Sequence, residues 1–335
     1  MYIFMGKNEE KASEVKESLA NTLERPTSEA TLSFQEKDII KFGEETGYEF
    51  CPKTMEKIFV VHREFMPIFE NGLAYLLAEN EKQNPDYYAF ARDGELLFDA
   101  LWGIGQAGEN DLVDRIHYLK TSMGMNKNKN NSKYLKEIGI TGQRFRQGPK
   151  MVFLDSAFKG SLFHKVGKWA SYRGNLPNKN MKGYLVKTSG SKFNQLNLSD
   201  KLINQVDEEK IRSVMQDSPY KNKIEYDLNF WACAFMQMMP KFTGRFVNPY
   251  KNENGKWDVF PERNSAVSKS NGIINQNSFQ PIPSEQYNSI SYESNHINVD
   301  IVNPTASLLL QKRTLDYFTD PNVHDRIYSR IKKKS

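Results

Sequence analysis

The feature that most constrains the fold is a three-part unit that recurs along the middle of the chain. Each unit has a short apolar run, a polar loop and an amphipathic helix. The apolar runs cover Tyr87–Phe90, Arg115–Leu119 and Met151–Leu154, and a fourth candidate strand covers Lys182–Lys187. A repeated strand–loop–helix order is typical of a parallel sheet covered by helices. The sequence therefore predicts an α/β protein with a parallel-sheet core.

Helical segments are expected on both sides of that core. They cover residues 9–23, 34–46, 54–79, 225–239 and 302–318. Pro67 should kink or split the third of these helices, because proline lacks the amide hydrogen that a helix interior uses. The stretch 243–285 is expected to be a long loop with one hairpin around Asn254-Gly255, and residues 330–334 a basic tail.

A chain of 335 residues has the length of roughly two domains, or of one large α/β domain. We expect a helical cap and leading helix at 1–83, an α/β core at 84–200 and a helical, loop-rich region at 201–335. No run reaches the ~18–20 apolar residues that a membrane helix needs, and the first residues have no hydrophobic core typical of a secretion signal. We therefore expect no membrane partner.

The cysteine and histidine content excludes some classes of protein. Only two cysteines are present, Cys51 and Cys233, which do not make a disulfide framework or a zinc site by themselves. The five histidines are scattered without the spacing of zinc hydrolases. A reducing compartment is indicated, and we expect a cytoplasmic protein.

Positive charge is concentrated in one part of the chain. Residues 120–187 contain 15 basic residues and two acidic ones, whereas the whole chain has a net charge of only +5. Such an asymmetry indicates an anionic ligand. The Lys/Asn-rich run at 124–132 is expected to be a mobile loop that could steer a polyphosphate, and Arg144 and Arg146 could reach a phosphate from a flexible loop.

Ligands of open parallel sheets bind beyond the carboxyl ends of the strands, so the loops there are the candidate site. The loop after the third strand runs from Asp155 to Ser161 and opens a helix. Backbone amides at a helix start favour phosphate, Gly160 would let the backbone approach it, and Ser156, Lys159 and Ser161 add a cation and hydroxyls. Asp155 could hold Mg²⁺ or ribose hydroxyls. The alternative is an ordinary helix cap. The loop lacks the GxxxxGK[ST] pattern of common nucleotide hydrolases.

The other two strand-end loops also carry polar groups. Arg92, Asp93 and Gly94 follow the first strand, and the alternative for them is an ion pair that only fastens the loop. Lys120, Thr121 and Ser122 follow the second strand and add one cation and two hydroxyls. Because parallel strands end at one edge of a sheet, these groups are expected near the Asp155 loop.

Together the two helix-opening loops resemble those of type I phosphoribosyltransferases. The segment Ala91-Arg92-Asp93-Gly94 resembles their pyrophosphate loop, and Met151–Ser161 resembles a shortened loop for phosphoribosyl pyrophosphate (PRPP). The chain is most similar to a divergent phosphoribosyltransferase-like group that has an Arg-Asp-Gly loop, over about residues 84–190. It departs from the common pattern in having Asp155-Ser156 for a double acid, and Asp93 for the second glycine. A binding-only role therefore stays open.

The resemblance implies a phosphoribosyltransferase-like core that binds and transfers a phosphorylated ribosyl group with Mg²⁺. Lys159–Ser161 would hold the 5-phosphate, and Arg92 with the backbone of Asp93 and Gly94 would hold the leaving pyrophosphate. Asp155 and Asp93 would be the metal ligands and, with Arg92, the catalytic residues. The predicted partner is a phosphorylated small molecule.

Two other functions remain as alternatives. A non-catalytic module could bind nucleic acid through the basic middle, although no known nucleic-acid motif is present. A haloacid-dehalogenase-like protein is a weaker alternative, because Ala91 stands where the nucleophilic aspartate of that family would be.

Overall fold

The computed structural model describes residues 25–46, 48, 52–108, 111–121, 125, 129–156, 160–186, 194–196, 209, 232, 236, 239–242, 246, 249–259 and 303–334. The helix predicted at 9–23 and most of the segments 225–239 and 243–285 lie outside these residues.

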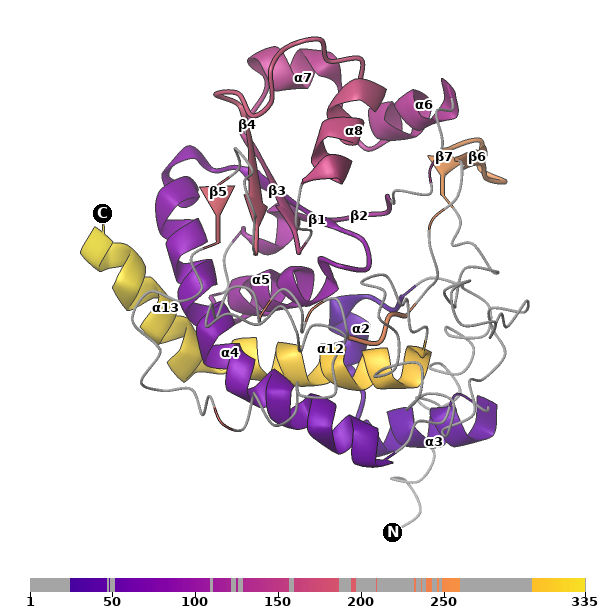
Figure 1. Ribbon diagram of the computed structural model, residues 1–335, viewed down its shortest axis with the longest axis vertical. Coiled ribbons are helices and arrows are strands. Elements are labelled where there is room, and N and C mark those ends of the chain that lie inside the picture. The colour runs from indigo at the N-terminus through magenta and orange to yellow at the C-terminus, as the bar shows by residue number, and fades with distance from the viewer. Residues whose placement is uncertain are drawn as a thin grey trace.

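The core is a five-stranded parallel sheet in the order β2-β1-β3-β4-β5 (Figure 1). The strands are β1 (Asp86–Phe90), β2 (Ile116–Leu119), β3 (Met151–Asp155), β4 (Met181–Leu185) and the short β5 (Asn194–Gln195). The four longer strands confirm the predicted positions to within two residues at each end.

Both faces of the sheet are buried, which explains the unbroken apolar character of its strands. Tyr87 and Ala89 of β1 point into one hydrophobic cluster, and Tyr88 and Phe90 point into a second one on the other face. The neighbouring β3 alternates in the same way. The protein is therefore a three-layer α/β/α structure, as the sequence predicted at the level of fold class.

The helices divide between the two faces (Figure 1). One face is covered by α4 (Pro52–Asn80), α5 (Glu95–Ala107), α12 (Pro304–Phe318) and α13 (Pro321–Lys334). The other is covered by α6 (Lys129–Glu137), α7 (Gly142–Gln147) and α8 (Ser161–Trp169). The chain moves one way from β1 to β2 and the opposite way from β2 to β3 and β4. Because such crossovers share one hand, opposite directions place the helices on opposite faces.

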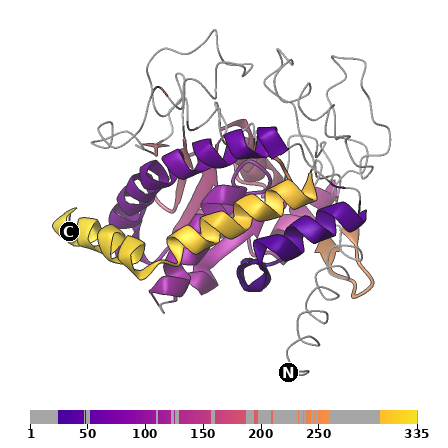
Figure 2. The same cartoon turned by 90° about the horizontal axis from the view of Figure 1, so that it is seen from below.

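Short helices and a hairpin complete the structure. Helices α2 (Ser28–Ser33) and α3 (Glu36–Thr46) pack against α12, as Figure 2 shows from below. Single 3₁₀ turns lie at Glu81–Gln83 and Val113–Arg115, and β6 (Tyr250–Lys251) pairs with β7 (Trp257–Asp258). This pairing confirms the predicted hairpin around Asn254-Gly255, and Gly255 has the positive φ of 74° that such a turn needs.

The start of α12 has two local features that fix its first turn. The side chain of Asn303 accepts a hydrogen bond from the Ala306 amide at 3.0 Å, and Pro304 occupies the first turn. Both are typical of a helix start, since the cap satisfies a free amide and proline has none to satisfy.

Two sequence predictions were wrong, and so was one of the two alternatives given for Pro67. The Lys/Asn-rich run is not wholly a loop, because Lys129 to Glu137 form α6, which buries Tyr134 and Leu135 against the sheet. Pro67 does not split α4, which continues through it over 29 residues. Burial of Phe65 and Phe69 on either side stabilises the helix against the roughly 3 kcal/mol cost of an interior proline.

The third error concerns the basic tail, which is the last turn of α13. Val323 and Ile327 are buried four residues apart and form a stripe that packs along α4. The run of basic residues at 330–334 suggested a tail, so the apolar stripe that precedes it was not recognised as part of a helix.

Candidate functional site

The candidate site lies where the sheet changes its direction of winding. Strands β1 and β3 are neighbours, but the helix after β1 covers one face and the helix after β3 covers the other. Ala89 pairs with Leu154, so continuing that register places Phe90 beside Asp155. The chain after these two residues leads to helices on opposite faces, an arrangement that in open α/β sheets defines a crevice at the carboxyl ends of the strands. We call this position the crevice. This is the position at which open α/β sheets bind their ligands.

The loop after β1 holds Arg92 in an unusual conformation. Arg92 is buried and has a φ of 71°, in the left-handed region that a non-glycine residue seldom adopts. Its amide donates to the Tyr118 hydroxyl at 3.2 Å, and its carbonyl accepts from the Lys241 ammonium at 3.4 Å. Two distant segments therefore clamp the peptide groups on either side of Arg92, which compensates for the strain.

Gly94 brings the same loop close to β3. A Cβ atom at Gly94 would lie 2.6 Å from the Phe90 carbonyl oxygen and 3.3 Å from the Leu154 carbonyl oxygen. Both neighbours are backbone atoms that cannot rotate away. Only glycine lets the start of α5 sit this close to the ends of both strands.

Asp93 is already paired. Its Oδ1 lies 3.3 Å from the ammonium of Lys241, which also donates to the Met236 carbonyl at 2.8 Å. The Lys241 side chain is 3% exposed and that of Asp93 is 40% exposed, so the pair runs from the interior to the surface. In this structure Asp93 fastens the loop, which is the structural alternative considered for it.

A buried polar cluster supports the loop from below. The Tyr118 hydroxyl donates to Glu95 at 2.7 Å, and burial followed by the charge of Glu95 raises the pKa of Tyr118 well above its usual value. The guanidinium of Arg25 pairs with Asp99, which also accepts from the Ser28 hydroxyl at 3.1 Å. The cavity between this cluster and α12 is only ≈ 10 Å³, about the space of one water. The loop therefore packs on buried, paired polar side chains that leave almost no empty space beneath it.

The loop after β3 borders the candidate site on the side opposite the Arg92–Gly94 loop. Asp155 is buried at the strand end and Ser156 is fully buried behind it. Gly160 has a φ of 64° and caps α8, and Ser161 begins that helix. Lys159 lies outside the described residues. The described part thus places a carboxylate and a helix start beside the Arg92–Gly94 loop.

The loop after β2 contributes less to the crevice. Lys120 pairs with Asp258 of the hairpin at 3.5 Å, and the buried Thr121 hydroxyl hydrogen-bonds at 3.5 Å to the Leu119 carbonyl. Ser122 lies outside the described residues. The ligand-binding roles predicted for these three residues stay predictions.

Among the described residues, three of the 15 basic residues at 120–187 pair with acids from elsewhere in the chain. Lys120 pairs with Asp258, and Lys182 pairs with Glu79 at 3.1 Å. Arg144 pairs with Asp86 at the amino end of β1, and α7 carries both Arg144 and Arg146. The expectation that Arg144 reaches a phosphate from a flexible loop was therefore wrong, because α7 holds it at the opposite edge of the sheet.

The predicted Mg²⁺ can be compared with the available donors. Mg²⁺ is commonly held by one or two carboxylates together with substrate phosphates and water. Asp155 fits such a role at the strand end. Asp93 would first have to release Lys241. Among the residues that the structure describes, no three His, Cys, Asp or Glu side chains are grouped as a metal site.

Sequence reasoning missed the residues that support the loop, namely Arg25, Glu95, Asp99, Tyr118 and Lys241. One signal was present: Glu95 and Asp99 are carboxylates four residues apart on an otherwise apolar helix, so they share a face. Such a pair inside an apolar helix indicates buried polar partners. Nothing in the sequence shows that those partners come from residues 25 and 241.

Comparison of the chain with family models, curated proteins and solved structures finds no match. Within the described part of the chain, no helix is both long and apolar enough to cross a membrane. The function must therefore be argued from the site itself.

Proposed function

We propose that the crevice beyond β1 and β3 binds a phosphorylated ribosyl ligand, such as PRPP or a nucleotide, with Mg²⁺. The observation that carries the proposal is that the two loops singled out from the sequence flank the one point where the sheet changes winding direction. That position favours a ligand whatever the family.

The chemistry of the two loops supports an anionic ligand. Gly94 and Gly160 are the N-cap residues of α5 and α8, and the helix dipole stabilises negative charge near such a helix start. Arg92 adds a cation, while Lys241 offsets the charge of Asp93. Asp155, at the end of β3, is the carboxylate that we assign to a ribose diol or a metal ion.

The resemblance to phosphoribosyltransferases supports transfer as well as binding. In such a reaction the bond from the ribose C1 to the pyrophosphate oxygen breaks, and its electrons leave with the pyrophosphate. The amides of Asp93 and Gly94 donate to the Ala91 and Phe90 carbonyls at 3.1 and 2.8 Å, so the Arg92 guanidinium is the group left to stabilise that charge. A nucleophile would form the new bond to C1. The acceptor that supplies this nucleophile is not indicated by any described residue.

Charge pairing removes three cations from the nucleic-acid alternative. Arg144, Lys182 and Lys120 pair with Asp86, Glu79 and Asp258, so these cations do not form an open basic surface. Non-specific nucleic-acid binding depends on several unpaired cations that can replace counterions along the backbone.

A thermal-shift panel tests the proposal. PRPP with Mg²⁺ at about 100 times its Kd should stabilise the protein by roughly 2.7 kcal/mol. Asp155→Asn should abolish the shift, whereas the matched control Arg144→Gln at the other edge of the sheet should retain it. No shift with PRPP, ribose 5-phosphate or nucleotides would overturn the proposal. Steeply salt-dependent binding to random RNA in its place would favour the alternative.

A further inference from the structure

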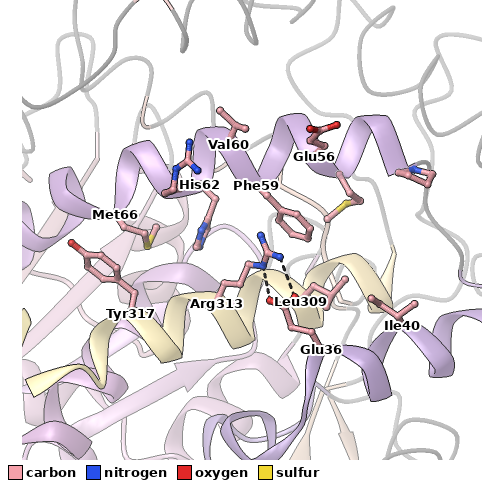
Figure 3. A pocket seen from close by; sticks show the side chains of 13 residues that line it. Glu36, Ile40, Glu56, Phe59, Val60, His62, Met66, Leu309, Arg313 and Tyr317 are labelled. Atoms are coloured by element: carbon pink, nitrogen blue, oxygen red, sulfur yellow. Dashed lines mark hydrogen bonds and ion pairs between the residues drawn. The ribbon is translucent and has the colours of Figure 1, made fainter.

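A second place for a ligand lies away from the sheet, in a groove between α3, α4 and α12 (Figure 3). Its volume is ≈ 710 Å³, within the range of about 300–1,000 Å³ typical of small-molecule sites. Apolar side chains form much of its wall, among them Ile40, Met55, Phe59, Met66 and Leu309. Among the described residues, Ile40 is the one exposed large hydrophobic side chain, at 40%. The groove therefore offers apolar surface to solvent.

One guanidinium is held inside this groove. Arg313 donates from Nε and Nη2 to the two carboxylate oxygens of Glu36, at 2.6 and 3.0 Å. Its Cζ lies 3.5 Å from the centre of the Phe59 ring, so the planar group is fixed on two sides (Figure 3). The side chain is still 36% exposed.

The outer edge of this guanidinium is available. Glu36 uses Nε and Nη2, and Nη1 has no hydrogen-bond partner among the residues that the structure describes. The Nη1–Nη2 edge of arginine is a fork that matches the two oxygens of a carboxylate. The groove thus combines apolar walls with one pre-oriented site for an oxyanion.

The other charged residues of the lining are Glu56 and Arg63, and Arg63 pairs with Glu64 at 3.2 Å. Burial, followed by the charge of Arg313, lowers the pKa of His62 to about 3, so this imidazole is neutral at pH 7. Thr314 donates its hydroxyl proton to the Leu310 carbonyl at 2.8 Å, so the His62 Nε2–H donates to Thr314 at 2.8 Å. Figure 3 shows Glu56 directed away from the gap between α4 and α12.

We propose that this groove binds an amphipathic monocarboxylate. Its carboxylate lies on the Nη1–Nη2 edge of Arg313, and its apolar body lies over Ile40, Pro52 and Phe59, which line the groove and keep exposed surface. Glu36 has two opposing effects: it orients Arg313, and its own negative charge opposes a second carboxylate.

This site is separate from the crevice at β1 and β3. Ser307 and Gln311 of α12 line the small cavity beneath the Arg92 loop, whereas Leu309 and Arg313 of the same helix line the groove. The inference stands on the groove alone and does not require the proposed function.

Calorimetric titration of the full chain with octanoate and with 1-octanol tests the proposal. The wild type should bind octanoate at least tenfold more tightly than 1-octanol, and Arg313→Gln should remove this preference. Ile40→Trp should narrow the groove from its exposed side and weaken both ligands at least tenfold.

Glu36→Gln separates ligand binding from a structural role. If Arg313 binds the carboxylate, this variant should strengthen octanoate binding by a few-fold, because the competing charge is gone. If the pair only fastens α3 to α12, Glu36→Gln and Arg313→Gln should both weaken binding. The proposal is overturned if the wild type binds the two ligands equally, binds neither, or loses octanoate in Glu36→Gln while circular dichroism shows a folded protein.

Discussion

Two regions of the molecule differ in the side chains around them, although α12 borders both. They are the crevice beyond β1 and β3 and the groove between α3, α4 and α12. Beneath the crevice, charged groups are buried and paired, and the cavity holds about one water. The groove is ≈ 710 Å³, and its walls are largely apolar. The comparison shows that cavity volume alone does not indicate the chemistry of a ligand. Topology and charge favour an anion at the crevice. The volume and the apolar walls of the groove favour an apolar body there.

The largest expected difference between the regions is the loss of unfolding free energy when one ion pair in each region is broken. The pairs are Arg25–Asp99 and Arg313–Glu36. Arg25 and Asp99 are 5% and 1% exposed, whereas Arg313 and Glu36 are 36% and 40% exposed. Asp99→Asn leaves a buried guanidinium without its carboxylate and should cost about 3–5 kcal/mol of unfolding free energy. Glu36→Gln should cost at most about 1 kcal/mol. Urea unfolding measures both, and similar losses would show that the two pairs do not differ as described.

Gly94→Ala tests the close approach of the loop to the sheet. The new Cβ would lie 2.6 Å from the Phe90 carbonyl, so the backbone must shift. We expect a loss of about 1–3 kcal/mol of stability and loss of the PRPP-induced thermal shift. Unchanged ligand binding in this variant would show that the loop geometry does not matter for the crevice.

His62 should make the groove side of the molecule sensitive to acid. Its pKa is about 3 in the folded protein and near 6.5 in the unfolded chain, so between these values the unfolded state binds more protons. Stability contributed by neutral His62 is therefore complete above pH 6.5 and is lost as pH falls. Between pH 6.5 and 5.5 the loss should be about 1 kcal/mol. Urea unfolding at both pH values should show this difference, and His62→Gln should remove it. An unchanged pH dependence in the variant would contradict the assignment.

Arg144→Gln should have the smallest effect on either ligand. Arg144 pairs with Asp86 at the amino end of β1, on the far edge of the sheet from the crevice. The PRPP-induced thermal shift and octanoate binding should both equal those of the wild type. A smaller PRPP-induced thermal shift in this variant would indicate that basic residues of the segment 120–187 contribute to ligand binding.

Sequence reasoning recovered the elements whose signals are local. The apolar strands, the helix starts and the loops at 91–94 and 155–161 follow from residue type and spacing over a few positions. The long helix at 54–79 was predicted, but its continuity through Pro67 and the helix of the Lys/Asn run were not. Tertiary burial of Phe65, Phe69 and Tyr134 outweighs poor local propensity there.

The parts of the two sites that escaped prediction are assembled from distant residues. Lys241 reaches Asp93 from 148 positions along the chain, and Arg313 reaches Glu36 from 277 positions away. An apolar stripe shows that a helix is buried, but not which side chain of another helix meets it. No single stretch of the sequence contains the residues that line the groove, because they come from α3, α4 and α12.

A crystal structure with bound ribose 5-phosphate and Mg²⁺ tests the central claim most directly. The account predicts the phosphate beside Gly94 and Gly160, at the starts of α5 and α8, with the ribose hydroxyls or the metal ion at Asp155. A sugar phosphate bound in the groove at Arg313, or on the outer surface of α6 to α8 with the crevice empty, would contradict it.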